Sequence, residues 1–288
     1  MKAVVLGTGM IGATVVKELS KLSSIDRITA VDGNQASIEH ALMVADSEKV
    51  DGKLARFCHD DYIFKILEGA DIAIACLPHS LSMPAIKAAI KAKCHLVDLV
   101  GSNFPEKAKL NSLAKKANVI IVPGSGVAPG ITNFLAARGI ELLDRAEEVV
   151  MICGGIPRHP QPPLMYQVVF RLESVMGLYT RPALAIENGE LIELEPLSGL
   201  EKIEFPEPVG ECEAVITDAH SVAYTLKDKV EKLYEKTMRY PGHWGKMAIL
   251  AELGFLDEKE IDFNGQKVSP RQFTAAVLEP QLKGGSDE

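Results

Sequence analysis

Three glycines near the start of the chain have the spacing of a phosphate-binding loop. Gly7, Gly9 and Gly12 follow the apolar run 3–6 and lead into residues with helical periodicity. In a strand–turn–helix unit the first glycine permits the tight turn, the second lets a pyrophosphate approach the backbone, and the third lets the helix lie close to the strand. The free N–H groups at the helix start favour a phosphate. The loop also contains Thr8, Met10 and Ile11.

A carboxylate, Asp32, ends the second apolar run about 20 residues after Gly12. At this position an acid accepts hydrogen bonds from the ribose hydroxyls of an adenosine. Gly33 and Asn34 follow, so no arginine is placed there for a 2′-phosphate, and a carboxylate would repel one. The sequence therefore predicts NAD rather than NADP, with Arg27 or a distant lysine as the open alternative.

Further candidates follow the later apolar runs, where ligands bind if these runs are strands of a parallel sheet. Asp98 interrupts the run 95–100 and is either a proton acceptor beside the cofactor or an acid that caps a loop. His79 is either a cofactor contact or an exposed loop residue. The second glycine-rich turn, 123–133, is either a wall of the nicotinamide pocket or a loop-to-helix joint. The expected cofactor contacts here are Leu77, Pro78, His79, Asp98, Gly126 and Pro129.

Alternating strands and helices are needed to position these residues. Apolar runs predict strands at 3–6, 28–31, 54–58, 71–77, 95–100 and 119–122. Helical spacing predicts helices at 13–22, 35–48, 84–91 and 131–143, with a short one starting at Asp60. This order is typical of an α/β fold, here a Rossmann-type doubly wound parallel sheet.

The pattern changes after Val149, and short strands separated by Gly, Pro and Asn become the expectation. They are 149–153, 165–172, 183–186, 191–194, 202–205 and 214–217, followed by helices at 226–233 and 245–253. Asn188 and Gly189 predict a hairpin turn. We therefore expect a second α+β domain with a mainly antiparallel mixed sheet. The expected boundaries are 1–125 for the NAD-binding domain and 126–243 for substrate binding and dimerisation. Completion of the first sheet by the segment 244–288 is an open alternative.

Composition limits the classes of function. The 288 residues are 47% hydrophobic and 24% charged, with a net charge of −8. These values are those of an ordinary globular protein and disfavour a general nucleic-acid binder. No apolar run approaches the roughly 20 residues of a membrane span. The five cysteines are scattered and form no C-x-x-C pair, so we expect buried thiols, no metal site and a cytoplasmic protein.

Several motifs together resemble one enzyme family. They are GTGMIG, the VD ending of the second strand, PGSGVAPGITN, CGGIP, YTRPA, ITDA and EKTMRYPGH. They are similar to those of the saccharopine dehydrogenase-like oxidoreductases and, within that family, most similar to the L-lysine 6-dehydrogenases. The resemblance implies an NAD-dependent homodimer that oxidises an amine-bearing carbon of lysine. Two features depart from it: Ala219 stands where relatives have glycine after Asp218, and relatives continue for another strand or two beyond Glu288.

Oxidation of an amine needs a proton acceptor, because an ammonium has no lone pair to drive out the hydride. His243, His220 and Asp98 are the candidates. A substrate carboxylate needs a bidentate cation, for which Arg239, Arg181 and Arg171 are candidates. Asp218 is expected at the substrate as well. The structural alternatives are salt bridges for the arginines and packing against Trp244 for His243.

Three hypotheses remain open from the sequence. The first is oxidative deamination of L-lysine or a lysine-like amino acid. The second is a reductase that condenses an aldehyde with an amino acid, as in saccharopine or carboxynorspermidine synthesis. The third is a non-catalytic NAD-binding sensor, since a fold alone does not prove activity.

Overall fold

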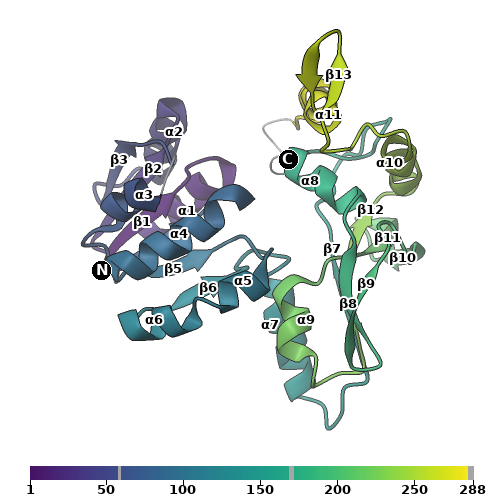
Figure 1. Cartoon of the computed structure of the whole chain (residues 1–288), viewed down its shortest axis with the longest axis horizontal. Coiled ribbons are helices and arrows are strands. Elements are labelled where there is room, and N and C mark those ends of the chain that lie inside the picture. Colours follow the sequence, from purple (N-terminus) through teal and green to yellow (C-terminus); the bar gives the residue numbers. More distant parts are fainter. Residues whose placement is uncertain (58–59, 169–171, 285–288) are drawn as a thin grey trace. The chain divides into compact units, whose positions relative to one another are not determined.

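The chain folds into two units, an N-terminal unit (Met1–Ile131) and a C-terminal unit (Thr132–Glu288). The computed structural model describes residues 1–57, 60–168 and 172–284. Figure 1 labels the helices and strands along the chain.

A six-stranded parallel sheet forms the centre of the N-terminal unit. Its strand order is β3-β2-β1-β4-β5-β6, the order of a dinucleotide-binding sheet. The strands are β1 (Lys2–Leu6), β2 (Arg27–Asp32), β3 (Val50–Leu54), β4 (Ile72–Ala75), β5 (His95–Asp98) and β6 (Ile121–Pro123). The predicted doubly wound α/β fold is confirmed.

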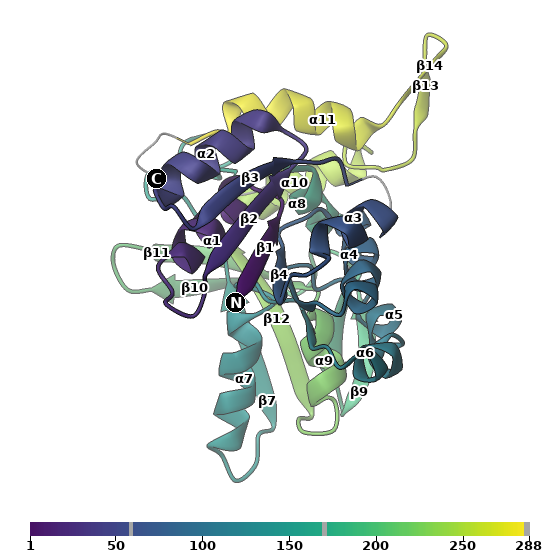
Figure 2. The same cartoon turned by 90° about the vertical axis from the view of Figure 1, so that its left-hand side faces the viewer.

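Helices cover both faces of this sheet, as Figure 2 shows. Along β1 the side chains alternate between the faces. Ala3 and Val5 belong to the apolar cluster that includes Val16 of α1, whereas Leu6 packs with the residues of α3 and α4. The helices are α1 (Met10–Ser20), α2 (Gln35–Ala45), α3 (Asp60–Leu67), α4 (His79–Ala92), α5 (Phe104–Ala108) and α6 (Asn111–Ala117).

The third strand lies earlier than predicted. We expected it at 54–58, but β3 occupies Val50–Leu54, where Gly52 pairs with Ala30 of β2. The sequence of β3, VDGKL, is mostly exposed and carries no apolar run that periodicity would detect. Cys58, at the end of the predicted strand, lies outside the described residues. The short helices α5 and α6 were not predicted.

The C-terminal unit contains a mixed sheet with the order β10-β11-β12-β8-β9. All neighbours on this path are antiparallel, and β7 pairs with β12 in parallel. The predicted hairpin at Asn188 and Gly189 is confirmed, because both residues have positive φ, as a type I′ turn requires. The strands are β7 (Glu148–Cys153), β8 (Ala183–Glu187), β9 (Glu190–Leu194), β10 (Glu201–Phe205), β11 (Gly210–Thr217) and β12 (Lys232–Arg239); β13 (Ile261–Phe263) and β14 (Gln266–Val268) form a separate hairpin.

Two predicted elements of this unit are wrong. The expected strand 165–172 is absent from the described residues of that stretch, and helix α8 begins at Leu172. The expected helix 226–233 is also wrong, since α9 ends at Leu226 and β12 begins at Lys232. The helices of this unit are α7 (Ile131–Glu141), α8 (Leu172–Met176), α9 (His220–Leu226), α10 (His243–Glu252) and α11 (Pro270–Leu278), with short 3-10 turns at Gly177–Tyr179 and Glu279–Gln281.

The segment 244–288 contributes no strand to the N-terminal sheet in its described part. Trp244, Met247 and Leu282 instead pack in one cluster with Tyr166 and Tyr179 of the C-terminal unit. The buried faces of aromatic and aliphatic residues thus hold this segment to its own unit.

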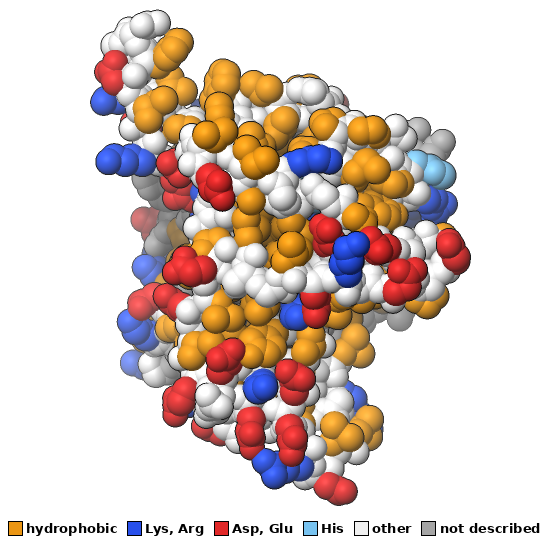
Figure 3. All heavy atoms as spheres, turned by 90° about the vertical axis from the view of Figure 1, so that its right-hand side faces the viewer, with side chains coloured by type: hydrophobic (Ala, Val, Ile, Leu, Met, Phe, Trp, Pro, Cys, Tyr) orange, Lys and Arg blue, Asp and Glu red, His pale blue; other side chains and the backbone are white. Residues whose placement is uncertain are grey.

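One face of the molecule carries hydrophobic side chains interspersed with acidic ones (Figure 3). In the described part of the chain, no helix combines the length and the apolar character needed to cross a membrane. The described cysteines Cys76, Cys94, Cys153 and Cys212 are free thiols.

Candidate active site

The loop between β1 and α1 is built around its three glycines. Gly7 has φ +87°, and a Cβ there would lie 2.4 Å from the carbonyl oxygen of Cys76. A Cβ on Gly12 would lie 1.9 Å from the carbonyl oxygen of Gly7. Gly9 differs, because a Cβ there would meet nothing within 4 Å. Two glycines are therefore needed by the fold, and the third leaves open space above the backbone.

Asp32 lies at the end of β2 and is joined to this loop. Its Oδ2 accepts a hydrogen bond from the backbone N–H of Thr8 at 2.7 Å, and its Oδ1 accepts one from Asn34 at 2.9 Å. The Thr8 side chain is buried, and its hydroxyl has no hydrogen-bond partner among the described residues. Arg27 lies at the other end of β2 and pairs with Asp51 at 2.6 Å.

These residues fit a bound dinucleotide. The first turn of α1 has no side-chain cap, so its N–H groups are available to a pyrophosphate over Gly9. Met10 and Ile11 in that turn are 64% and 47% exposed. Leu77, Pro78 and His79, which the sequence predicts as cofactor contacts, follow β4, the neighbour of β1.

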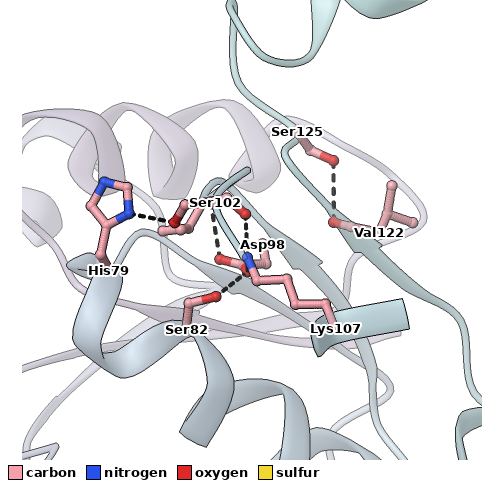
Figure 4. Close-up of polar contacts among 8 residues, drawn as sticks. His79, Ser82, Asp98, Ser102, Lys107, Val122 and Ser125 are labelled. Atoms are coloured by element: carbon pink, nitrogen blue, oxygen red, sulfur yellow. Dashed lines mark hydrogen bonds and ion pairs between the residues drawn. The ribbon is translucent and has the colours of Figure 1, made fainter. Parts of the chain in front are cut away.

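Asp98 is fully buried at the end of β5 and already has three donors, as Figure 4 shows. Its Oδ2 accepts hydrogen bonds from Ser82 Oγ at 2.6 Å and from Lys107 Nζ at 3.0 Å. Its Oδ1 accepts one from the backbone N–H of Val100 at 3.1 Å. Lys107 is buried too and also donates to the Val100 carbonyl at 2.5 Å. This arrangement corresponds to the loop-capping alternative for Asp98, since the fully buried carboxylate is bound by three donors of its own unit, one of them a lysine.

The other residues at this end of the sheet are organised by short hydrogen bonds. His79 is exposed, with Nδ1 2.7 Å from Ser102 Oγ (Figure 4). In the second glycine-rich turn, the N–H of Gly126 donates to the Pro129 carbonyl at 2.8 Å, and Ile131 donates back to Gly126 at 3.0 Å. The turn is therefore a compact joint that leads into α7.

His243 is completely buried at the start of α10. Its Nε2 lies 2.9 Å from the Tyr179 hydroxyl, and its Nδ1 lies 2.9 Å from the Leu164 carbonyl oxygen. Burial lowers the pKa of His243 to about 4. Both ring nitrogens are already paired within the protein, and burial disfavours the protonated ring, which matches the packing alternative rather than a proton acceptor.

Arg239, at the end of β12, is buried with an incomplete set of partners. Its Nη1 donates to the Met238 carbonyl at 2.8 Å, and its Cζ lies 4.8 Å from the centre of the Tyr166 ring. Its Nε has no hydrogen-bond partner among the residues that the structure describes. A buried guanidinium with an unused donor is suited to an anion.

The other two predicted arginines differ from Arg239. The side chain of Arg181 is 57% exposed and pairs with Glu258 at 2.7 Å, so it forms the salt bridge given as its structural alternative. Arg271, which was not predicted, also binds Glu258. Arg171 lies outside the described residues.

Asp218 and His220 form a hydrogen-bonded pair after β11. Nδ1 of His220 lies 2.8 Å from Asp218 Oδ2, and the His220 N–H donates to Asp218 Oδ1 at 2.9 Å. His220 has φ +50°, a left-handed conformation that is uncommon outside glycine. Burial acts to raise the pKa of Asp218, but the contacts with His220 outweigh it and the net shift is downward. A histidine oriented by a carboxylate through one ring nitrogen is a typical general-base arrangement.

Glu235, on β12, is a further candidate that the sequence did not reveal. It is 4% exposed, and its Oε2 has no hydrogen-bond partner in the described part of the chain. Burial raises the pKa of Glu235 to about 7, His220 acts against this shift, and Asp218 adds to it. The sequence predicts a helix at 226–233 and no strand at Lys232–Arg239. A strand with polar residues on its buried face lacks the alternation of apolar residues that would reveal it.

Comparison with known proteins places the chain in a family. Residues 3–122 match the model of the saccharopine dehydrogenase NADP binding domain, and residues 126–288 match that of the saccharopine dehydrogenase C-terminal domain.

Among the described residues, no group of three or more His, Cys, Asp or Glu side chains is arranged to hold a metal ion.

Similar proteins include a saccharopine dehydrogenase (NADP⁺, L-glutamate-forming) from Schizosaccharomyces pombe, 26% identical over 77% of this chain and 52% of that protein. A carboxyaminopropylagmatine dehydrogenase from Synechocystis is 23% identical over 96% of this chain and 72% of that protein. The structure of apo saccharopine dehydrogenase (L-Glu forming) from Saccharomyces cerevisiae aligns with a TM-score of 0.76 and 17% identity, over 100% of this chain and 79% of that one. The chain spans 52% and 60% of the length of two fungal saccharopine dehydrogenases. Because the C-terminal domain model alone covers more than half of its residues, the chain belongs to the saccharopine dehydrogenase family.

Proposed function

We propose that the protein is a homodimeric dehydrogenase that uses NAD to oxidise the amine-bearing carbon of L-lysine or a lysine-like amino acid. The observation that carries the proposal is the open backbone at Gly9, under a helix start and beside Asp32, in a saccharopine dehydrogenase family member. The motif EKTMRYPGH supports lysine as the substrate through its resemblance to L-lysine 6-dehydrogenases.

The residues of the chain have distinct roles in this proposal. Arg239 binds the substrate carboxylate through its unused donor. His220, oriented by Asp218, accepts the proton that the substrate ammonium must lose before hydride can leave. The bound nicotinamide supplies the hydride acceptor. Asp98 and His243 hold the loop after β5 and the start of α10, because their polar atoms are already paired within the protein.

The coenzyme proposal is testable at Asp32. Replacing it by asparagine keeps the shape but removes the charge, so we expect the NAD dissociation constant to rise roughly 10-fold and that of NADP to fall. Asp51→Asn is the matched control, since Asp51 lies on the neighbouring strand and pairs with Arg27 instead. Tighter binding of NADP than of NAD by the unaltered protein would contradict this assignment. Arg56 would then be the next residue to substitute, because it adjoins Ala55, whose N–H donates to the Asp32 carbonyl at 2.9 Å.

The reaction is tested with the same proteins. We expect L-lysine and NAD to generate the NADH absorbance band, and Asp32→Asn to lower kcat/KM for NAD with little change in KM for lysine. If no NADH forms with L-lysine, with other basic amino acids or with diamines, the deamination proposal is wrong.

A second candidate is the condensing reductase. The fungal relatives named as NADP⁺, L-glutamate-forming saccharopine dehydrogenases favour it. Its signature would be NADPH or NADH consumption that requires both an aldehyde and an amino acid. An NADH band with L-saccharopine but not with L-lysine would select this reaction class.

A further inference from the structure

Strand β12 places three polar side chains in a row on one buried face of its sheet. Side chains two residues apart on a strand share a face, so Leu233, Glu235, Thr237 and Arg239 point the same way. Leu233 packs in an apolar cluster with residues of α9. The other three form what we call the polar row, in which Glu235 and Arg239 are each only 4% exposed.

Glu235 and Arg239, the two ionisable residues of the polar row, lie far apart along the strand. Their Cα atoms lie four strand positions apart, roughly 13 Å. Oε2 of Glu235 and Nε of Arg239 both lack hydrogen-bond partners within the described residues. A buried polar atom without a hydrogen-bond partner is costly, so two such atoms on one face need an explanation.

The side chains between Glu235 and Arg239 along the row, and beside it on β11, are polar. Thr217 of β11 is buried, and its hydroxyl lies 3.0 Å from that of Thr237. On the opposite edge of β12 from β11, Cys153 of β7 is in register with Thr237. A ligand that lies along the row would therefore pass over hydroxyl groups rather than over an apolar surface.

Titratable groups of three other elements interact electrostatically with Glu235. Asp218 follows β11, His220 begins α9 and Cys153 lies on β7, whereas Arg239 lies four residues away on the same strand. Two carboxylates close to one another attract a cation.

On the basis of the proposed function, we propose that Glu235 binds the remote amino group of a basic amino acid whose carboxylate is held by Arg239. The α-amine of an amino acid adjoins its carboxylate, whereas the ε-amine of lysine lies at the far end of the side chain. Because the Cα atoms of Glu235 and Arg239 are roughly 13 Å apart along the strand, Glu235 is placed for the remote amine rather than for the α-amine beside the carboxylate. The polar row thus selects an amino acid with a positive charge at its end.

This role predicts a specific pH dependence of binding. The pKa of Glu235 is raised to about 7, mainly by burial, so below that pH the carboxyl is protonated and pairs poorly with an ammonium. The dissociation constant for L-lysine should therefore fall as the pH rises through 7.

The test is calorimetric titration of the NADH-bound protein with L-lysine, comparing Glu235→Gln with the unaltered protein. We expect the dissociation constant for lysine to rise roughly 10- to 100-fold in the variant and its pH dependence near 7 to disappear. NADH binding should change less than about twofold. Glu201→Gln is the matched control, because Glu201 pairs with Lys236, which points to the opposite face of β12.

Two analogues of lysine show whether Glu235 binds the ε-amine or the α-amine. 6-Aminohexanoate lacks the α-amine, and Glu235→Gln should weaken its binding as much as it weakens the binding of lysine. L-Norleucine lacks the ε-amine and should bind both proteins equally. Equal lysine affinity in both proteins, or equal weakening of both analogues, overturns the role of Glu235 while leaving the proposed function intact. If the unaltered protein binds neither L-lysine nor L-saccharopine, the proposed function fails and the inference fails with it.

Discussion

Two buried acids, Asp98 and Glu235, illustrate how partners decide the role of a residue. Asp98 accepts hydrogen bonds from Ser82, Lys107 and Val100, which fixes the loop after β5. Glu235 is as deeply buried, but one of its oxygens has no partner among the described residues. Both are carboxylic acids and both are buried, so the unmet hydrogen-bonding capacity is the difference on which the proposed binding role of Glu235 rests.

At the residue scale we predict that Lys107 stabilises the fold through Asp98. Lys107→Met leaves a buried carboxylate without its cation, and such a loss costs about 3–5 kcal/mol in the free energy of unfolding. Urea unfolding would measure it, with Lys109→Ala as control. The exposed pair of Lys109 with Glu106 should contribute less than about 1 kcal/mol. If Lys107→Met unfolded normally but lost turnover, Asp98 would belong to the catalytic residues after all.

At the scale of the element, the loop from β1 to α1 shows that identical residues serve different purposes. Gly7 and Gly12 are required because a Cβ would overlap neighbouring backbone. Gly9 has φ −64°, a conformation open to any residue, so the fold does not need glycine there. Space for a phosphate is the remaining reason for it.

Two variants separate these purposes. Gly12→Ala should displace α1, lower the free energy of unfolding by about 1–3 kcal/mol and abolish dinucleotide binding. Gly9→Ala should unfold at the temperature of the unaltered protein yet lose NADH binding. Thermal unfolding and NADH fluorescence titration give the two readouts. Full NADH affinity in Gly9→Ala would mean that the pyrophosphate does not approach this backbone.

At the scale of the whole molecule, two buried titratable groups in the C-terminal unit act on stability in opposite pH directions. Burial lowers the pKa of His243 to about 4, from 6.5. Burial raises that of Glu235 to about 7, from 4.5. Each group is therefore uncharged in the folded protein over a pH range in which the unfolded chain carries the charge.

The free energy of unfolding should consequently fall both towards low pH and towards high pH. His243 stabilises the fold fully above pH 6.5, and this contribution, roughly 3 kcal/mol, is lost as the pH falls towards 4, because only the unfolded chain binds the proton. Glu235 contributes fully below pH 4.5, and roughly 3 kcal/mol is lost as the pH rises through 7. Thermal unfolding should show that Glu235→Gln unfolds at a higher temperature than the unaltered protein above pH 7. A variant less stable at that pH would show that Glu235 is ionised and satisfied in the fold.

Sequence patterns predicted what depends on neighbours along the chain. The glycine loop with Asp32, the parallel N-terminal sheet and the turn at Asn188 and Gly189 all rest on local spacing and backbone conformation. The strand at 165–172 and the helix at 226–233 were wrong, because short apolar runs suit either periodicity and tertiary packing selects one.

The sequence by itself determined a dinucleotide-binding unit followed by a mixed-sheet unit, and it indicated candidate residues for the proposed amine chemistry. Only the tertiary structure decided which of those residues are already paired: Asp98 with Lys107, His243 with Tyr179, and Arg181 with Glu258. It also brought Glu235 and Arg239 onto a buried sheet face without mutual contact. The physical reason is that burial and hydrogen-bond partners come from residues distant along the chain, and the types and spacing of neighbours do not encode those encounters.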